Sequence, residues 1–218
     1  MKISKRGEYA LRALIDLGIA HELGRPLVQI GELAEKENLP IKFLEQILMQ
    51  LKEAGFIDSK RGKLGGYYLL KPAAQISFGQ VIRLIDGPLA PIACVSHNFY
   101  ERCSCPDEEH CGLRMLMHEV RNAISNILDR FTLEDTVRMT LDKVRKNKPH
   151  IPFIDAILQS SPEGEALLFD PGAKRHSAAI RPPKIPPTAK SLMVKKEVLA
   201  QNGKPKRKAR AAINPTSA

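Results

Sequence analysis

The stretch from Pro40 to Pro72 constrains the fold of this chain more than any other part of it. Its first half, PIKFLEQILMQLKEA, places apolar side chains at helical spacing, and Gly55 follows where a left-handed helix cap forms most easily. Two short apolar segments, which begin at Phe56 and Tyr67, then flank the basic, glycine-rich sequence KRGKLGG. The pattern predicts a helix, a turn and a β-hairpin with a basic tip.

Two amphipathic segments precede this stretch. The first predicts a helix from Lys5 to His21 with Ser4 as its N-cap, and the second predicts a helix from Val28 to Glu37. The second and third helices form a helix-turn-helix, to which the hairpin adds a wing. In such domains the third helix enters the DNA major groove and the wing reaches phosphates or the minor groove. We therefore predict a fold that is mainly α with a small β-hairpin wing, in which residues 1–72 form a winged helix-turn-helix DNA-binding domain.

The third helix has one apolar and one polar face. The apolar positions, which we expect to be buried, are Ile41, Leu44, Ile47, Leu48, Leu51 and Ala54. The polar face can hydrogen-bond base edges, the cations of the hairpin can meet phosphates, and its glycines permit a tight turn and close approach to DNA. The alternative is an ordinary charged surface. The candidate DNA-binding residues are Lys42, Phe43, Glu45, Gln46 and Gln50 in the helix, and Lys60, Arg61, Lys63, Gly65, Gly66 and Tyr67 in the wing.

Composition narrows the function further. Aromatic residues are only 5% of the chain and Trp is absent, which argues against base stacking as the main DNA contact. No apolar run is as long as a membrane span and no signal-like segment opens the chain, so we expect a cytoplasmic protein without a membrane partner. The net charge of +10 lies in residues 145–218, which hold 15 basic and 5 acidic residues, so the basic pI alone does not identify a DNA-binding protein.

The second half of the chain divides into two parts. In residues 73–144, the segment from Leu113 to Phe131 carries an apolar stripe over about five turns, and we interpret it as a homodimer interface rather than a helix packed only in its own chain. The sequence TLED then predicts the start of a last helix to about Val144. Residues 145–218 are rich in proline and basic near the end, which predicts a mostly disordered tail that binds DNA loosely or has no specific role. Within it, Asp155 to Ser160 is a candidate short helix.

An irregular loop over residues 87–111 holds all four cysteines, Cys94, Cys103, Cys105 and Cys111. Eight, one and five residues separate them, which does not match the paired CxxC motifs of zinc knuckles. In a reducing cytosol such a group is more often a metal site than a set of disulfides, and thiolates suit iron–sulphur clusters or zinc. The residues leave open a cluster in a sensor loop, a zinc site, and reduced thiols without metal.

Several motifs together resemble the Rrf-two family (Rrf2) of bacterial winged-helix transcriptional regulators. They are GEYALRALIDL, FLEQIL, GFIDSKRGKLGGYYLLKP, ISFGQVIRLIDGP, and C-x5-CGLRMLMHEVRNAISNILD followed by TLED. The resemblance runs from about Lys2 to Val144 and leaves out the tail. It implies a homodimer that binds a pseudo-palindromic operator in double-stranded DNA and holds a [2Fe-2S] or [4Fe-4S] cluster through three cysteines.

The resemblance also implies which residues bind the cluster. The ligands are Cys94, Cys111 and, by the usual five-residue gap, Cys105, with Cys103 as an alternative ligand. The position where the family's cluster regulator has a histidine ligand holds Arg114, whereas Glu8 matches a carboxylate that nitric-oxide sensors of the family supply from the partner subunit. Glu8 is equally suited to be a surface glutamate, and His97 and His110 are weaker candidates for the fourth ligand. Glu45 matches a family glutamate that discriminates operators, which fits a carboxylate that accepts from cytosine.

We therefore predict a non-enzymatic, sequence-specific repressor whose operator binding responds to iron, cluster supply, nitric oxide or redox state. The first alternative is a regulator of the same fold without a cluster, sensing zinc or thiol chemistry. The second is an iron–sulphur electron-transfer protein, which is disfavoured because the sequence has no nucleotide loop, second cluster motif or catalytic triad. No small-molecule substrate is expected.

Overall fold

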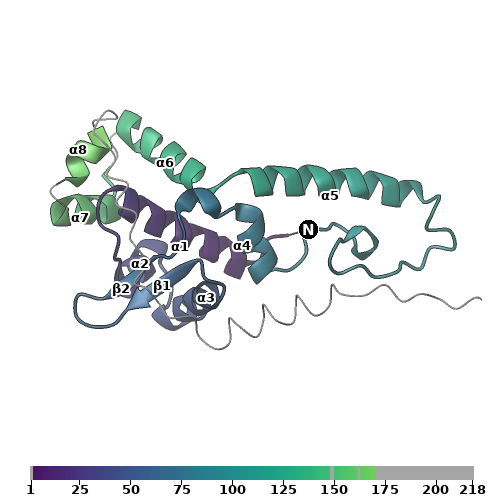
Figure 1. The fold of residues 1–218 in the computed structure, drawn as a ribbon, viewed down its shortest axis with the longest axis horizontal. Helices are drawn as coiled ribbons and strands as arrows, with labels where there is room; N and C mark the ends of the chain where they lie inside the picture. Colours follow the sequence, from purple (N-terminus) through teal and green to yellow (C-terminus); the bar gives the residue numbers. More distant parts are fainter. Residues whose placement is uncertain (1, 148–149, 162, 170–218) are drawn as a thin grey trace, which may run out of the picture. The chain divides into compact units, whose positions relative to one another are not determined.

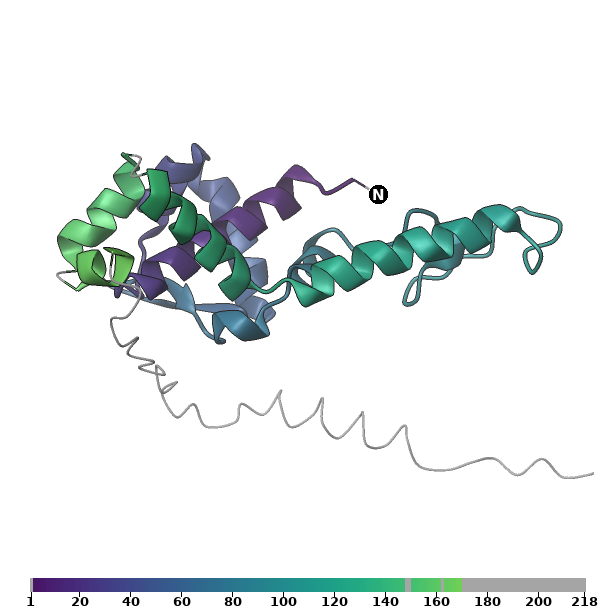
Figure 2. The same ribbon diagram turned by 90° about the horizontal axis from the view of Figure 1, so that it is seen from above.

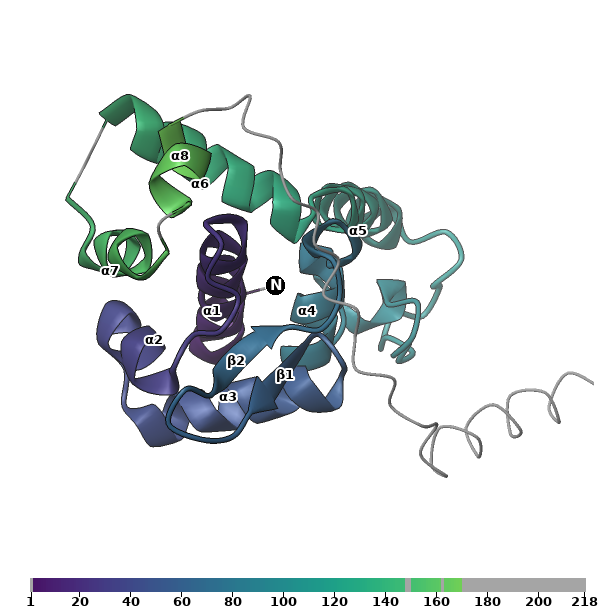
Figure 3. The same cartoon turned by 60° about the vertical axis from the view of Figure 1, so that its left-hand side comes forward.

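The central element of the fold is α1 (Lys5–Glu22). The structure is a computed structural model that describes residues 2–147, 150–161 and 163–169. Figures 1 and 3 show α1 surrounded by α2, α3, α4, α6 and the hairpin. Its alanine and leucine side chains are almost fully buried because they fall on the helix faces that these neighbours cover. As predicted, Ser4 caps the helix, and its hydroxyl accepts a 3.0 Å hydrogen bond from the Gly7 N–H.

The helix-turn-helix comprises α2 (Ile30–Glu37) and α3 (Ile41–Glu53). Asn38 makes the turn between them in the left-handed conformation, with φ of 52°. Gly55 ends the motif with φ of 72°, as the sequence predicted. The predicted start of the second helix at Val28 was wrong, because the backbone of Val28 pairs with the hairpin instead.

The wing is a two-stranded antiparallel sheet of β1 (Ile57–Lys60) and β2 (Gly66–Leu69), in which Ile57 pairs with Leu69 and Lys60 with Gly66. The predicted fold class, mainly helical with a hairpin wing, is confirmed. The third-helix stripe is also confirmed at its centre, where four apolar side chains are fully buried. Ile41 is an exception. It lies in the first turn of α3, and 48% of it is exposed.

A connector with the short helix η1 (Ala73–Gln75) leads to α4 (Phe78–Ile85) and then to the cysteine loop, which contains η2 (Ala93–Val95). The loop folds back along α5 (Gly112–Arg130), as Figures 1 and 2 show. Arg83 of α4 donates two hydrogen bonds, of 2.6 and 2.7 Å, to the carboxylate of Asp129 on α5. A Cβ at Gly79 would collide with the Asp129 and Arg83 side chains, so the absence of a side chain there leaves room for this ion pair.

The last helices extend the core beyond the predicted boundary at residue 144. They are α6 (Leu133–Asn147), α7 (Pro152–Ser160) and α8 (Gly164–Phe169). The predicted disordered tail was wrong for its first described residues, because Phe153, Ile154, Ile157 and Leu168 are buried against the core. The candidate short helix from Asp155 to Ser160 is confirmed within α7, which already begins at Pro152. The basic run near the end of the tail lies outside the described residues.

Charged side chains are buried between α1 and α2. Lys36 forms an ion pair with Asp16, which is 1% exposed, and Arg12 forms one with Glu37. Burial raises the pKa of Asp16 to about 7, although the neighbouring Lys36 ammonium lowers it. The ring of Phe153 on α7 lies 5.2 Å from the Lys36 ammonium and helps to bury the pair. In the part of the chain described, no helix combines the length and apolarity needed to cross a membrane.

Candidate DNA interface and cysteine site

The exposed face of α3 carries most of the predicted base-reading side chains. Lys42, Glu45 and Gln46 are exposed, and Gln50 is half-buried. The Oε1 atom of Gln50 is buried and has no hydrogen-bond partner among the described residues, so Gln50 would have to turn outward to read a base. The face offers one cation, one carboxylate and two amides, which are the groups that read base edges.

Two of the predicted DNA-binding residues pack within the protein. The Phe43 ring meets Tyr9 of α1 edge-on, with ring centroids 6.0 Å apart and an interplanar angle of 89°. Tyr67 is half-buried, and its backbone exchanges hydrogen bonds of 2.8 and 3.1 Å with Val28. Both residues fix the positions of the recognition helix and the wing. Direct contact of either side chain with DNA stays a prediction.

The tip of the wing is cationic and exposed. Lys60, Arg61 and Lys63 all face solvent, and no ion pair within residues 2–147 includes any of them. Leu64 beside them is 87% exposed. The Gln29 side chain donates a 3.2 Å hydrogen bond to the Lys63 carbonyl, which ties the tip to the start of α2. Three uncompensated cations held beside a helix-turn-helix suit a phosphate backbone.

The glycine pair of the wing is required by close contacts within the chain. A Cβ at Gly65 would collide with the backbone of Lys60 to Gly62, and one at Gly66 would lie 2.5 Å from the Val28 carbonyl oxygen. These contacts explain the predicted tight turn. The predicted close approach of the glycines to DNA is not tested by them.

The cysteine loop brings two thiols together with a carboxylate. The Sγ atoms of Cys94 and Cys103 and a carboxylate oxygen of Glu108 all lie within 4.8 Å of one another. Cys94 is buried and the other two residues are half-buried. Soft thiolates and one carboxylate are a donor set that suits iron or zinc.

Cys105 and Cys111 continue this group. The neighbouring thiol of Cys103, with a smaller contribution from burial and from Cys111, raises the pKa of the Cys105 thiol to about 11. The backbone N–H of Cys105 holds the pKa of Cys103 below its usual value, whereas burial raises the pKa of the Cys94 thiol. The four predicted cysteines therefore form a series of neighbours, in which Cys103, the predicted alternative ligand, lies beside Cys94 and Cys105 lies between Cys103 and Cys111.

Glu108 is the member of this site that the sequence analysis missed. The Tyr100 hydroxyl donates to its carboxylate at 2.8 Å, and the Arg114 Nε lies 3.3 Å from it. Arg114 also donates a 3.3 Å hydrogen bond to the Cys94 carbonyl, so the arginine at the family's histidine position ties α5 to the cysteine loop. The acidic run DEEH between Cys105 and Cys111 was the available signal, but a run of exposed acids does not indicate which one turns inward.

The remaining candidates for the fourth ligand are Glu8, His110 and His97, and each has different neighbours. Glu8 is 42% exposed and pairs within its own helix, at 2.7 Å with Lys5 and 3.6 Å with Arg12. His110 is exposed, and its ring lies 2.9 Å from the Asp107 carboxylate. His97 is exposed and lines a separate pocket near α5. A ligand role for Glu8 in a partner subunit stays a prediction.

A helix-turn-helix with a polar recognition face and a basic wing, joined to a long helix, defines a winged-helix DNA-binding regulator. Comparison with known proteins agrees: the family model Rrf2, described as an iron-dependent transcriptional regulator, matches residues 3–139. The chain belongs to the Rrf2 family of transcriptional regulators.

Relatives and a solved structure support this assignment. A Rhodobacter capsulatus protein named as rrf2-like is 39% identical over 135 residues, which are 61% of this chain and 90% of the relative. IscR of Photobacterium profundum is 29% identical over 138 residues, 63% of this chain and 76% of the relative. The structure of CymR, titled the global cysteine regulator of B. subtilis, matches with a TM-score of 0.54 and 32% identity, and the match covers 64% of this chain and 98% of CymR.

Proposed function

We propose that the protein is a repressor that binds a pseudo-palindromic operator as a homodimer and that its cysteine loop controls this binding. The recognition face of α3 reads bases in the major groove, and the wing meets phosphates or the minor groove. The proposal rests on the presence of two features in one Rrf2-family chain. The wing is basic and forms no ion pair among the described residues, and the loop contains four neighbouring cysteines.

The exposed face of α5 supports the homodimer. Leu113, Leu116, Val120 and Ile127 lie along one stripe of this helix, and each is between 36% and 58% exposed. An apolar stripe of this length is costly in water, and a two-fold axis beside α5 would bury it against its own copy. A dimer also matches the symmetry of a pseudo-palindromic operator.

The donor set of the cysteine loop fits an iron–sulphur cluster. Cys94, Cys103 and Glu108 already converge, Cys105 and Cys111 adjoin them, and Cys111 is the N-cap residue of α5. Cys94, Cys111 and either Cys103 or Cys105 would hold the cluster, with Glu108 or the partner's Glu8 as the fourth ligand. When bound, the cluster would supply reversible electron transfer and sensitivity to oxidants and nitric oxide. The chain's own part is to link the loop to α5 through Cys111 and Arg114.

A second function is favoured by the contacts among the thiols. Neighbouring cysteines without a metal can form disulfides under oxidation, and the CymR structure shows that a cysteine regulator shares this fold. In this second function the cysteine loop senses thiol oxidation directly. Zinc binding by the same loop is a further form of regulation without an iron–sulphur cluster.

An anaerobic spectrum of the purified protein separates these functions. We expect broad visible absorption, with iron and acid-labile sulphide in the same sample, and loss of all three in Cys94→Ser. Cys103→Ser and Cys105→Ser then decide which of the two is the third ligand, since the bystander variant keeps its absorption. A colourless protein without iron or sulphide after anaerobic reconstitution would contradict the cluster and leave thiol or zinc sensing.

The salt dependence of DNA binding tests the wing. We expect Lys60→Ala, Arg61→Ala and Lys63→Ala together to lower the slope of log K against log salt by about 1 for each lost phosphate contact. The operator would be selected from random duplexes and binding followed by fluorescence anisotropy. The matched control removes the exposed cations Arg130, Lys143 and Lys146, which changes the net charge equally. Equal slopes in the two triple variants would contradict the role of the wing.

A further inference from the structure

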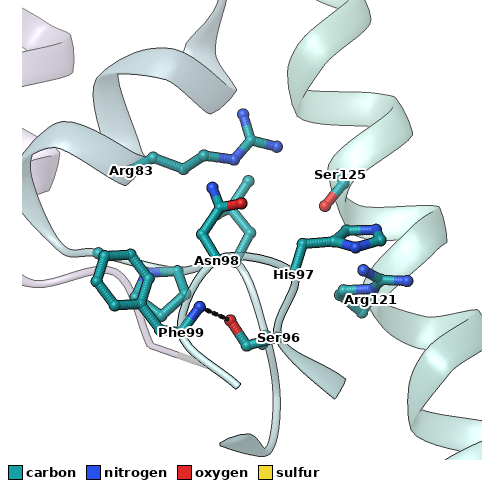
Figure 4. A pocket seen from close by; sticks show the side chains of 11 residues that line it. Arg83, Ser96, His97, Asn98, Phe99, Arg121 and Ser125 are labelled. Carbon is teal, nitrogen blue, oxygen red and sulfur yellow. Dashed lines mark hydrogen bonds between the residues drawn. The ribbon is translucent and has the colours of Figure 1, made fainter. Parts of the chain in front are cut away.

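A pocket lies where the start of the cysteine loop passes between α4 and α5. It has an empty volume of about 380 Å³, counted out to open solvent. Figure 4 shows Arg83 reaching in from α4 and Arg121 and Ser125 from α5, with Ser96 to Phe99 of the loop between them. Every cysteine of the loop lies outside its lining.

The unusual member of this pocket is Arg121. It is the one buried residue of α5, at 5% exposure. Its Nη2 atom lies 3.0 Å from the His118 Nδ1 and donates at 2.7 Å to the Asn122 Oδ1. Its Nε and Nη1 atoms have no hydrogen-bond partner, and no carboxylate among the described residues forms an ion pair with it.

A buried guanidinium in this state is energetically unfavourable. Burying a charge is costly unless it is paired and hydrogen-bonded, and a guanidinium offers two parallel N–H groups that match a carboxylate. Arg83 does not share this state, because Asp129 neutralises it at 2.6 Å. The pocket therefore holds one uncompensated positive charge.

The rest of the lining limits the kind of anion that fits. Ser96 and Ser125 offer hydroxyl groups, and Asn98 offers an amide, all able to donate to an anion. Leu89 and Phe99 give the pocket an apolar wall. One unpaired cation beside polar donors and an apolar wall favours a singly charged anion with a small apolar part.

We propose that this pocket binds a small organic monocarboxylate, whose carboxylate pairs with the guanidinium of Arg121. The ligand would contact α4, the loop and α5 together, so its binding stabilises the arrangement of these three elements. The inference rests on the charge and burial of Arg121 and not on the cysteine site or on DNA binding.

Thermal unfolding of the full chain with defined probes tests this proposal. Butyrate is the carboxylate probe, butyramide is its uncharged counterpart, and inorganic phosphate is the anion without an apolar part. We expect butyrate at millimolar concentration to raise the Tm by about 3 °C or more, with little effect of butyramide and a smaller effect of phosphate. Phosphate equal to butyrate would overturn the monocarboxylate assignment, and no response to either anion would overturn the site.

Substitution of Arg121 shows whether the response arises in this pocket. Arg121→Met keeps the volume and removes the charge, so it should fold at least as stably as the parent without ligand and lose the butyrate response. Arg130→Met, on the exposed surface of the same helix, should keep the response. If Arg121→Met does not fold, Ser125→Ala is the second variant, and it should weaken butyrate binding several-fold in calorimetry. An unchanged response in a folded Arg121→Met or Ser125→Ala variant would refute the proposal.

Discussion

At Gly66 the backbone of the wing touches the backbone that leads into α2. Val28 and Tyr67 exchange two hydrogen bonds beside it, so the wing is fixed to the helix-turn-helix by main-chain contacts that no side chain could replace. The relative position of wing and recognition helix therefore depends on the absence of one Cβ atom.

Gly66→Ala should lower the free energy of unfolding by about 1–3 kcal/mol, because its Cβ would lie 2.5 Å from the Val28 oxygen and the neighbour is backbone. Urea denaturation measures the effect. Gly31→Ala is the matched control, since its Cβ would meet nothing within 4 Å and alanine favours the helix by about 0.5–1 kcal/mol. Equal stability of the two variants would contradict the importance of this contact.

The roles of single residues could be predicted where they depend on neighbours in the sequence. They could not be predicted where they depend on long-range contacts. The cap at Ser4 and the left-handed Gly55 follow from a few neighbouring residues, and both were predicted. Glu108 and Arg121 owe their special positions to residues distant in the chain, such as Cys94 for the first. A sequence pattern contains no sign of which acid or arginine such folding will bury.

Among the elements, α7 shows most clearly how the core extends beyond the family match. That match ends at residue 139, yet Ile157 of α7 is fully buried and the Phe153 ring lies over the ammonium of Lys36 on α2. Helix α7 therefore stabilises the helix-turn-helix from outside the family region.

Ile157→Ala should lower the free energy of unfolding by about 2–4 kcal/mol, because truncation of a buried isoleucine leaves a cavity. Met139→Ala on α6 is the control: its side chain is 55% exposed, so the change should stay within about 0.5 kcal/mol. Chemical denaturation of the full chain gives both values. A small loss for Ile157→Ala would mean that α7 does not contribute to the cooperative core.

The type and order of elements could be predicted down to α6 because their apolar periodicity is strong. Errors occurred where two signals competed. Val28 was assigned to a helix from its neighbours, although its backbone bonds belong to the wing. After residue 144 the average composition indicated a mostly disordered tail, so the short helix expected from Asp155 to Ser160 was not expected to join the core, although α7 does so.

For the whole molecule, the main question is what covers α5. Its exposed stripe and the loop lie on different sides of the helix, because Arg114 and Arg121 face the loop while Leu116 and Ile127 remain exposed. A second copy on the exposed side would leave the cysteine loop in place.

Leu116→Asp with Ile127→Asp should convert the protein to a monomer near the chain mass of 24.3 kDa, because burying two charges in an apolar interface is costly. Sedimentation velocity measures this. Met115→Asp is the control, since Met115 is as exposed as Ile127 but lies off the stripe. A dimer that survives the double substitution, or is lost equally in the control, would contradict the interface.

The double hydrogen bond between Arg83 and Asp129 has a mechanical consequence. With a rise of about 1.5 Å per residue, Asp129 lies about 27 Å along the helix from Cys111. If α5 is treated as a rigid rod held at Asp129, a displacement of about 1 Å at its Cys111 end corresponds to a rotation of about 2° over that length. The ion pair connects α5 to α4, and α4 contacts α1, which contacts α3, so these contacts offer a route by which such a rotation would reach α3. Under the proposed function, a change at the cysteines would therefore reach the exposed face of α3 as a rotation, and the strength of the Arg83–Asp129 ion pair would determine how much of that rotation is transmitted.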